Sequence, residues 1–246
     1  MRLAGKKALV TGGGSGFGAG IARKFSEEGA AVAIADIDIA SAEKVAGEIE
    51  GVAIETDVAD SESVERLSKD VHAQFGGLDV LVNNAGITHL PSPMEEIAED
   101  EFDRVFAVNC KSVYLTAKHF IPLMKSRGGG SILNVASTAG VSPRRNLSWY
   151  NASKGWMITA TMTMAIELAE YSIRVNALTP VAGETPLLKR FLGEDTPEMR
   201  AKFLATIPLG RFSAPEDIGN AACFLCSDEA SLITGTALNV DGGRCI

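Results

Sequence analysis

Tyr150 and Lys154 have the side chains and the spacing for acid–base catalysis. They stand four residues apart at the head of a long segment with apolar residues at helical spacing, so both side chains lie on one helix face. A phenol with a pKa near ~10 is a poor acid at neutral pH. A lysine cation beside it favours the phenolate and lowers that pKa toward the working range. Such pairs also occur by chance on helix surfaces, so the assignment depends on the rest of the chain.

A glycine-rich turn near the N-terminus has the pattern of a phosphate-binding site. The apolar run 7–10 predicts a buried strand, the turn Thr11–Gly18 follows at once, and apolar residues then recur at helical spacing up to Gly29. Glycines in such a turn let the backbone approach a pyrophosphate, and the N-terminus of the helix presents free N–H groups to it. The strand–turn–helix context therefore predicts a dinucleotide site.

The second predicted strand, 31–35, ends at Asp36. This position lies ~20 residues beyond the turn, where an acidic residue accepts hydrogen bonds from an adenosine ribose. The carboxylate would also repel a 2′-phosphate, although capping of the next helix is an alternative role for it. No Arg or Lys lies within the glycine turn or between Asp36 and Lys44. The sequence therefore favours NAD over NADP as the cofactor.

Predicted strands alternate with predicted helices, which is typical of a parallel, doubly wound α/β sheet. The strands are predicted at residues 7–10, 31–35, 52–55, 79–82, 131–135, 173–178 and 237–240. Longer helices are predicted at about 40–50, 61–75, 150–170 and 215–227. No repeat, low-complexity tract or linker interrupts the chain. We therefore expect one Rossmann-type domain over 1–246, with helices on both faces of about seven strands and a substrate-lid segment at about 187–212.

Glycine and polar positions gather at the carboxyl ends of these strands, where doubly wound sheets bind ligands. They are Gly12, Asp36, Asp57, Asn83 and Ser137. Their coincidence supports a ligand site more strongly than any one of them. Asn109 lies among apolar residues of a predicted helix, where it is a poor helix former and, if buried, needs hydrogen-bond partners. It is either a satisfied core amide or a residue placed for chemistry.

Charge and composition argue against several classes of protein. The formal net charge of -8 and the pI of about 5.0 do not suit a surface for nucleic acid or an anionic membrane. No apolar run reaches the ~18 residues of a membrane span, and the N-terminal residues lack a signal-peptide pattern. We therefore expect a soluble, cytoplasmic protein. Cys223 and Cys226 lie on an apolar helix face without a second Cys or His pair nearby, so we interpret them as buried thiols and predict no metal site.

Taken in order, these residues resemble the pattern of the short-chain dehydrogenase/reductase family. The resemblance runs from about Lys7 to Gly243, essentially the whole chain, and the ordered set of motifs is highly specific. The matching motifs are Thr11-Gly-x-x-x-Gly16-x-Gly18, Asn83-Asn84-Ala85-Gly86, Asn109, Ser137 and Tyr150-x-x-x-Lys154. The presence of these other motifs supports a catalytic interpretation of Tyr150 and Lys154.

The resemblance implies a catalytic role for four side chains. Tyr150 would be the general acid/base, with its phenolate favoured by Lys154 and by the positive nicotinamide ring. Ser137 would hydrogen-bond the substrate oxygen, and Lys154 would also hold the nicotinamide ribose. Asn109 would keep a water in a proton relay through Lys154 to solvent. Hydride leaves carbon while a proton leaves oxygen, so one base and one hydrogen-bond donor suffice without a metal.

The resemblance also implies the cofactor contacts. Asp57 and Val58 would bracket the adenine, Asn83 would back the adenosine side, and Thr185 would hydrogen-bond the nicotinamide carboxamide. The full set is Gly12, Ser15, Gly16, Phe17, Gly18, Asp36, Asp57, Val58, Asn83, Tyr150, Lys154, Gly183 and Thr185. The stretch 180–185 departs from the usual family pattern, because Gly183 replaces a bulkier residue. We expect this loop to keep its cofactor role.

The substrate pocket is expected to be lined by the loop 138–149, by His89 and by the segment 187–211. Arg144 and Arg145 in that loop would suit a carboxylate, sulfonate or phosphate of an anionic substrate. A solvated loop tip or a subunit contact is the alternative role for these arginines.

The sequence thus predicts an NAD(H)-dependent oxidoreductase, a homotetramer like similar family members, that interconverts an alcohol and its ketone or aldehyde. Its glycine turn, the stretch 183–186 and the ending 241–244 resemble a branch that includes dehydrogenases of sulfonated benzyl alcohols. One alternative is a 3-oxoacyl-carrier-protein reductase using NADPH, although Ser15 stands where those reductases usually carry a basic residue. A non-catalytic NAD-sensing protein is a more remote alternative, because a sensor does not need the base Tyr150.

Overall fold

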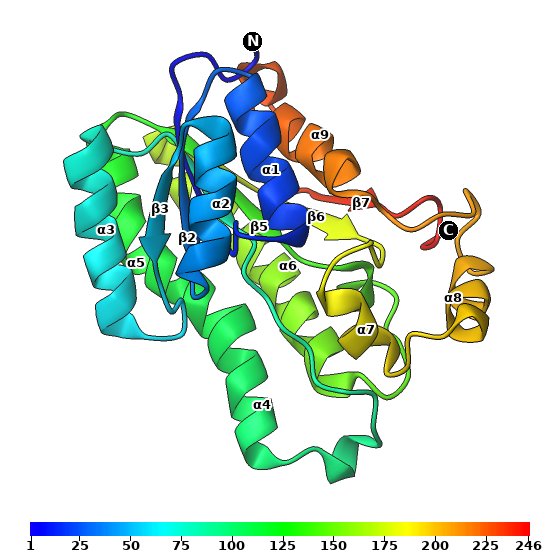
Figure 1. The fold of residues 1–246 in the computed structure, drawn as a ribbon. Coiled ribbons are helices and arrows are strands. Elements are labelled where there is room, and N and C mark those ends of the chain that lie inside the picture. Colours follow the sequence, from blue (N-terminus) through cyan, green and yellow to red (C-terminus); the bar gives the residue numbers. More distant parts are fainter.

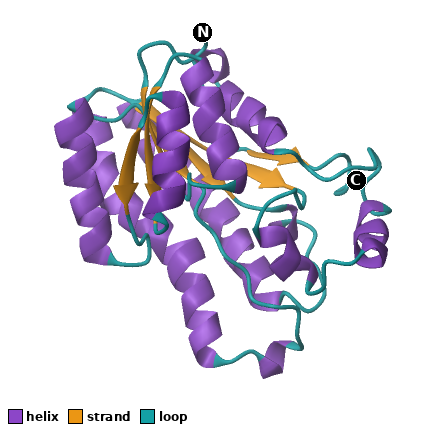
Figure 2. Ribbon diagram, in the orientation of Figure 1, coloured by secondary structure: helices purple, strands orange, loops and turns teal.

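Seven parallel strands form the single sheet of the computed structural model, which describes residues 1–246 (Figures 1 and 2). The strands are β1 (Lys7–Thr11), β2 (Ala31–Asp36), β3 (Val52–Glu55), β4 (Val80–Asn83), β5 (Gly130–Val135), β6 (Ile173–Pro180) and β7 (Ala237–Val240). Their order in the sheet is β3-β2-β1-β4-β5-β6-β7, and each neighbouring pair is parallel. The predicted Rossmann-type sheet is confirmed, with strand boundaries within two residues of the prediction.

Helices cover both faces of the sheet, as predicted (Figure 1). The helices on one face are α1 (Gly16–Glu27), α2 (Ile39–Ile49) and α9 (Pro215–Cys226). The helices on the other face are α3 (Ser61–Phe75), α5 (Ser112–Ser126) and α6 (Ser148–Leu168). Successive strand residues point to opposite faces, so Val10 joins the core under α1 and Leu9 joins the core under α3 and α5. Strands covered on both faces are apolar along their length.

The order of the strands reverses between β1 and β4. The chain runs from β1 outward to β2 and β3, and then returns to the other side of β1 as β4. The connections that leave the carboxyl ends of β1 and β4 therefore diverge and open a crevice between them. Doubly wound sheets bind their ligands at such a switch point.

The helix predicted around Asn109 is interrupted in the structure. α4 (Glu99–Phe106) passes into a π-helical turn, Ala107–Lys111, and α5 continues from that turn. Asn109 lies in the middle of the wider turn and is fully buried. Turns of this kind are rare inside α-helices and are frequent at functional sites.

The segment predicted as a lid contains two short helices, α7 (Leu187–Leu192) and α8 (Pro197–Leu204), and no strand. Phe191 of α7 and Phe203 of α8 share an apolar cluster with Tyr150, at the start of α6. The segment therefore packs beside the residue predicted to be the catalytic base.

Three predictions from composition can be compared with the structure. None of the helices combines the length and the apolar character that a membrane crossing requires. All four cysteines are free, and Cys223 and Cys226 are buried in α9 as predicted. No group of three or more His, Cys, Asp or Glu side chains is arranged to hold a metal ion.

Candidate active site

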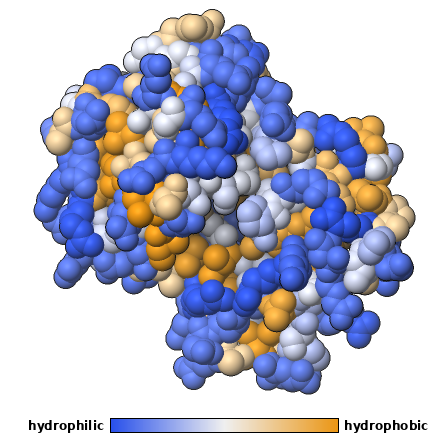
Figure 3. All heavy atoms as spheres, in the orientation of Figure 1, coloured by the Kyte–Doolittle hydropathy of each residue, from blue (hydrophilic) through white to orange (hydrophobic).

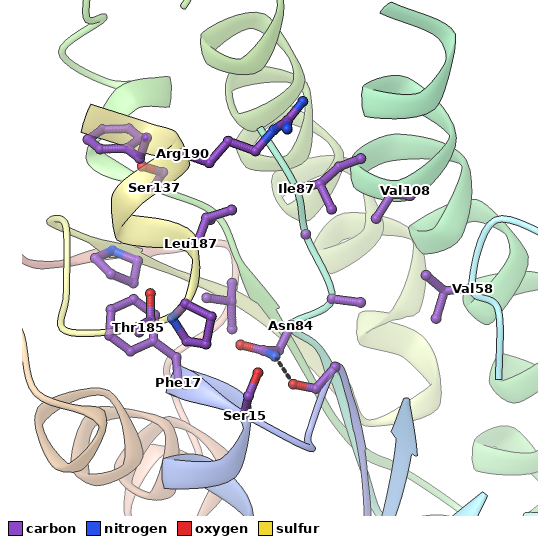
Figure 4. A pocket seen from close by; sticks show the side chains of 18 of the residues that line it. Ser15, Phe17, Val58, Asn84, Ile87, Val108, Ser137, Thr185, Leu187 and Arg190 are labelled. Atoms are coloured by element: carbon purple, nitrogen blue, oxygen red, sulfur yellow. Dashed lines mark hydrogen bonds between the residues drawn. The ribbon is translucent and has the colours of Figure 1, made fainter. Parts of the chain in front are cut away.

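A cavity of about 700 Å³ opens at the carboxyl edge of the sheet, at the switch point between β1 and β4. Its walls come from the glycine turn, the ends of β2, β4 and β5, the start of α6, and the connection from β6 into α7. Figure 3 shows apolar side chains gathered in the middle of this face, between α2 and α4, with polar side chains around them. Figure 4 shows part of the lining, with side chains that reach the cavity from opposite walls.

Most of the predicted site residues line this one cavity. They are Gly12, Ser15, Gly16, Phe17, Asp36, Asp57, Val58, Ser137, Tyr150, Lys154, Gly183 and Thr185. Three others, Gly18, Asn83 and Asn109, lie behind its surface. Gly18 belongs to the inner side of the turn, where an added Cβ would overlap the Gly12 carbonyl.

The glycine turn is shaped to approach a phosphate. Gly12 has φ +61°, and a Cβ there would lie 2.8 Å from Ala85 Cα in the segment after β4. Asn84 Nδ2 donates to the carbonyl oxygens of Thr11 and Gly12, both at 2.9 Å, and so ties the turn to that segment (Figure 4). Ser15 makes no side-chain cap at the start of α1, so the first N–H groups of this helix remain available for an anion.

The side chain of Asn83 points into the core and not into the cavity. Its side chain donates to Asn134 Oδ1 at 2.8 Å and accepts from Thr116 Oγ1 at 2.8 Å, inside the core under α5. The neighbouring residue Asn84 lines the cavity instead. Successive residues of a strand point in opposite directions, so the last residue of β4 faces the core and the next one faces the turn.

The connection from β6 departs from the family pattern for a steric reason. A Cβ on Gly183 would lie 2.7 Å from the Ser213 carbonyl oxygen and would overlap the ring of Phe17. The glycine therefore makes room for the phenylalanine that this chain carries in its glycine turn. A Cβ on Gly16 would lie 3.1 Å from the Thr185 side chain, which shows that Thr185 lies over the start of α1. Gly183 and Thr185 both line the cavity, as expected.

Asp36 is held at one end of the cavity by backbone groups. Its carboxylate accepts from Gly14 N at 2.9 Å and from Asp38 N at 3.1 Å. The cap of α2 is Asp38, which accepts from Ser41 N, so the alternative role of Asp36 as that cap is wrong. The cationic residues that line the cavity come from α4, α6 and α7, and none comes from the turn that carries Asp36.

Tyr150, Ser137 and Lys154 meet at the other end of the cavity. Tyr150 is 4% exposed, and both Tyr150 and Ser137 line the cavity. Ser137 Oγ accepts from Ala139 N at 3.1 Å, which fixes the hydroxyl at the end of β5. Lys154 Nζ donates to the Val135 carbonyl at 2.9 Å and lies 6.0 Å from the centre of the Tyr150 ring.

Burial dominates the acid–base behaviour of this group. It raises the pKa of the Tyr150 phenol, and the nearby Ser137 hydroxyl opposes that rise. Burial also lowers the pKa of Lys154 to about 8. The sequence predicts that Lys154 lowers the pKa of Tyr150, together with the positive nicotinamide ring. Without the cofactor that pKa is raised instead, because removal from water disfavours both charged forms.

Asn109 is a satisfied core amide that holds the cavity wall in place. Its Oδ1 accepts from Ile87 N and its Nδ2 donates to the Ile87 carbonyl, both at 2.9 Å. Nδ2 also donates to Ser153 Oγ at 2.9 Å, next to Lys154 on α6. The π-helical turn is thereby fastened to the segment after β4 and to the catalytic helix. Its part in a proton relay stays a prediction.

The predicted substrate contacts need correction. His89 is buried: Nδ1 donates to the Leu90 carbonyl, and Nε2 accepts from Tyr150 N at 3.4 Å, so this residue supports α6 instead of lining the cavity. The loop 138–149 does not line the cavity either. Arg144 packs behind α7, where its guanidinium lies 4.8 Å from the Phe191 ring and donates to the Phe191 carbonyl at 2.6 Å. Arg145 is exposed at the loop tip.

Other residues of the lining were missed by the sequence analysis. They include Asn84, Ile87, Arg104 and Val108. Leu187 and Arg190 also line the cavity, and they belong to the segment 187–211 that was expected to do so. For Arg104 and Val108, the signal was their closeness in sequence to Asn109.

A family model described as enoyl-(acyl carrier protein) reductase matches residues 12–244. Over their full lengths, the chain is 46% identical to the 4-formylbenzenesulfonate dehydrogenase of Comamonas testosteroni. This chain belongs to the short-chain dehydrogenase/reductase family.

Further members of the family match over nearly the whole chain. The 3-oxoacyl-[acyl-carrier-protein] reductase of Thermotoga maritima is 38% identical, with 100% of both chains covered. A solved structure of a 3-ketoacyl-(acyl-carrier-protein) reductase from Brucella melitensis, complexed with NADH, superposes with a TM-score of 0.95. It is 50% identical and the match covers 99% of this chain and 100% of that one.

As a short-chain dehydrogenase/reductase, the protein is an oxidoreductase that acts on CH–OH groups with a nicotinamide cofactor. The residues present fit such a dinucleotide. The cavity offers a glycine turn without Cβ atoms, uncapped N–H groups at α1, and a carboxylate held at the end of β2.

We predict that the substitution Lys154→Met stabilises the protein without cofactor at about pH 7. Burial lowers the pKa of Lys154 from 10.5 to about 8. The folded state therefore holds this proton less tightly than the unfolded chain does, and the charged lysine destabilises the fold. This destabilisation is complete below about pH 8 and decreases as the pH rises toward 10.5. The urea midpoint of the variant should exceed that of the parent at about pH 7, and the difference should shrink at about pH 10.

Lys44→Met, on the exposed side of α2, is the matched control and should leave the midpoint unchanged at both pH values. A Lys154→Met variant that is less stable by the same amount at both pH values would show that the hydrogen bond to Val135 outweighs the cost of burial.

Proposed function

We propose that the protein is an NAD(H)-dependent oxidoreductase that interconverts an alcohol and its ketone or aldehyde, with Tyr150 as general acid/base. The observation that carries this proposal is the convergence of Tyr150, Ser137 and buried Lys154 on one end of the cavity, opposite Asp36. A base at one end and a ribose acceptor at the other match the two ends of an extended dinucleotide.

Bound NAD supplies the hydride acceptor. Ser137 receives a backbone N–H on its oxygen, so its own O–H is free to donate to the substrate oxygen. Tyr150 Oη takes the proton from the substrate hydroxyl during oxidation and returns it during reduction. Lys154 stabilises the phenolate while that proton is away, and with a pKa of about 8 it can also release a proton itself. The apolar cluster of Phe191 and Phe203 keeps water from the tyrosine.

NAD is the proposed cofactor rather than NADP. The Asp36 carboxylate is fixed by two backbone N–H groups and has no cation on its own turn, so a 2′-phosphate there would meet an uncompensated negative charge. The solved structure of the relative from Brucella melitensis, which is complexed with NADH, is consistent with this choice.

An aromatic alcohol or aldehyde is the favoured substrate class. The similarity to a 4-formylbenzenesulfonate dehydrogenase supports it, and so do the apolar side chains that α7 contributes to the cavity. A 3-oxoacyl-carrier-protein reductase is the second candidate, supported by the two relatives of that name. For either substrate class, we propose that the segment 187–212 is the substrate lid. The cytoplasmic location of the protein stays a prediction.

We also propose that the enzyme is a homotetramer. α5 and α6 lie side by side on one face of the sheet, and their outer surfaces expose large apolar side chains. Ile166 is 80% exposed, and Trp156, Met162 and Tyr114 are also exposed. Association between copies would remove this surface from water. Light scattering checks the assembly, and a mass equal to one chain of 25.9 kDa would contradict it.

Tyr150→Phe is expected to separate binding from catalysis. The variant keeps the ring and its contact with Phe191 but lacks the hydroxyl, so NADH should still bind while turnover falls by about 10²- to 10⁴-fold. Fluorescence titration measures the first quantity and NADH absorbance the second. Tyr171→Phe, on a partly exposed turn, should keep full activity. Unchanged turnover in Tyr150→Phe would overturn the mechanism and favour a binding protein.

The charge at position 36 should decide between the two cofactors. The parent is expected to bind NADH more tightly than NADPH, and Asp36→Arg should reverse that order, because a guanidinium pairs with a 2′-phosphate. Asp36→Asn removes only the repulsion and should give an intermediate preference. Glu43→Arg changes an exposed residue of α2 by the same charge and should have no effect. A parent that prefers NADPH would instead direct the substrate search to 3-oxoacyl thioesters.

A further inference from the structure

Arg190 projects from α7 into the cavity without a role in the proposed hydride and proton transfer. Leu187, Arg190 and Phe191 stand at helical spacings of three and four residues, so they share one face of the helix. All three line the cavity. In Figure 4, Leu187 and Arg190 extend from α7, and Arg190 reaches toward the segment that carries Ile87. One side of the cavity therefore combines two apolar side chains with a guanidinium.

The guanidinium lies at the catalytic end of the cavity. Arg190 Nε donates to the Thr88 carbonyl at 2.7 Å, and the next residue, His89, accepts from Tyr150 N. On the other side of Arg190, the Phe191 ring lies 5.9 Å from the Tyr150 ring, edge to face. Contacts on both sides thus join Arg190 to the surroundings of the catalytic base, far from the turn that carries Asp36.

The charges around Arg190 do not balance. Its Nη2 pairs with Glu101, and the same carboxylate also accepts from Arg104 Nη2 at 2.9 Å. Two guanidinium groups that line the cavity therefore share one carboxylate, which leaves an excess positive charge. Nη1 of Arg190 makes no hydrogen bond within the chain, and the side chain is 41% exposed. Donors remain available for a second anion.

We propose that Arg190 binds an anionic substituent, a carboxylate or sulfonate, on an aromatic alcohol or aldehyde whose ring packs against Leu187 and Phe191. This inference rests on the proposed function, because it adds a recognition group to the same site. Guanidinium matches the geometry of carboxylate and sulfonate oxygens. Arg190 takes the part that the sequence analysis gave to Arg144, which is turned away behind α7.

Glu101 acts as an internal competitor in this arrangement. It occupies one edge of the Arg190 guanidinium, so an incoming anion has to share or displace it. Removal of the Glu101 charge should therefore strengthen the binding of an anionic ring. If the Arg190–Glu101 pair only holds α7 in place, loss of either partner should instead weaken binding alike. The effect of removing the Glu101 charge on anion binding therefore distinguishes the two explanations.

The test is a calorimetric titration of the full-length protein, with and without NADH, using 4-methylbenzoate and its neutral counterpart 4-methylbenzamide. Neither compound can be oxidised at an alcohol carbon, so the result does not depend on turnover. Arg190→Gln should weaken the benzoate by about tenfold, the lower end for a charged hydrogen bond because the side chain is partly exposed. The same variant should leave the benzamide and NADH unchanged.

Glu101→Gln should bind the benzoate more tightly than the parent, and Arg145→Gln, the same change at an exposed loop tip, should match the parent. Equal losses in Arg190→Gln and Glu101→Gln would overturn the proposal, and so would a parent that binds benzoate no better than benzamide. If Arg190→Gln weakened only the binding of NADH, Arg190 would be a cofactor-binding residue and the proposal would be wrong. Failure of the proposed function would appear separately, as a parent that binds the benzoate but oxidises no alcohol with NAD.

Discussion

The buried ammonium of Lys154 sets the conditions for the rest of the site. It is 4% exposed, it has no carboxylate partner, and its acceptor is the Val135 carbonyl at the end of β5. A charge in such a place is costly, so rigid elements have to hold it there. The centre of the sheet supplies the acceptor, and α6 supplies the lysine. Gly86 leaves the space beside it, because a Cβ at that position would lie 3.2 Å from Nζ.

This constraint accounts for the way charge is divided along the cavity. The carboxylates of Asp36 and Asp57 lie at one end, whereas Lys154 and Arg190 lie with the catalytic tyrosine. No acid near Tyr150 competes with its phenolate for the lysine. Burial alone keeps the phenol protonated, and a positively charged ring bound above it would favour ionisation. In the proposed mechanism, Tyr150 therefore becomes a base only when the cofactor fills the site.

The sheet and the position of Tyr150, Lys154 and Asp36 at one cavity could be predicted because their signals are local. Tyr150 and Lys154 lie on one turn of helix, and Asp36 ends an apolar run. The direction of side chains at a strand end was harder to predict, because Asn83 and Asn84 are adjacent in sequence but point in opposite directions. Contacts of the segment 187–212 could not be predicted from a local pattern, since Arg190 donates to a carbonyl 102 residues earlier in the chain. The π-helical turn likewise depends on tertiary partners rather than on propensity.

The three hydrogen bonds of Asn109 have a consequence for folding. They join positions 22 and 44 residues apart in the chain, from the segment after β4 to the second turn of α6. Each such contact requires closure of the intervening loop, which costs chain entropy. The glycine turn depends on a still longer separation, because Asn84 reaches carbonyls 72 and 73 residues earlier in the chain, so neither end of the cavity forms from local contacts alone. Because only the complete cavity holds both ends of a dinucleotide, the ligand stabilises the finished enzyme and not its partly folded forms.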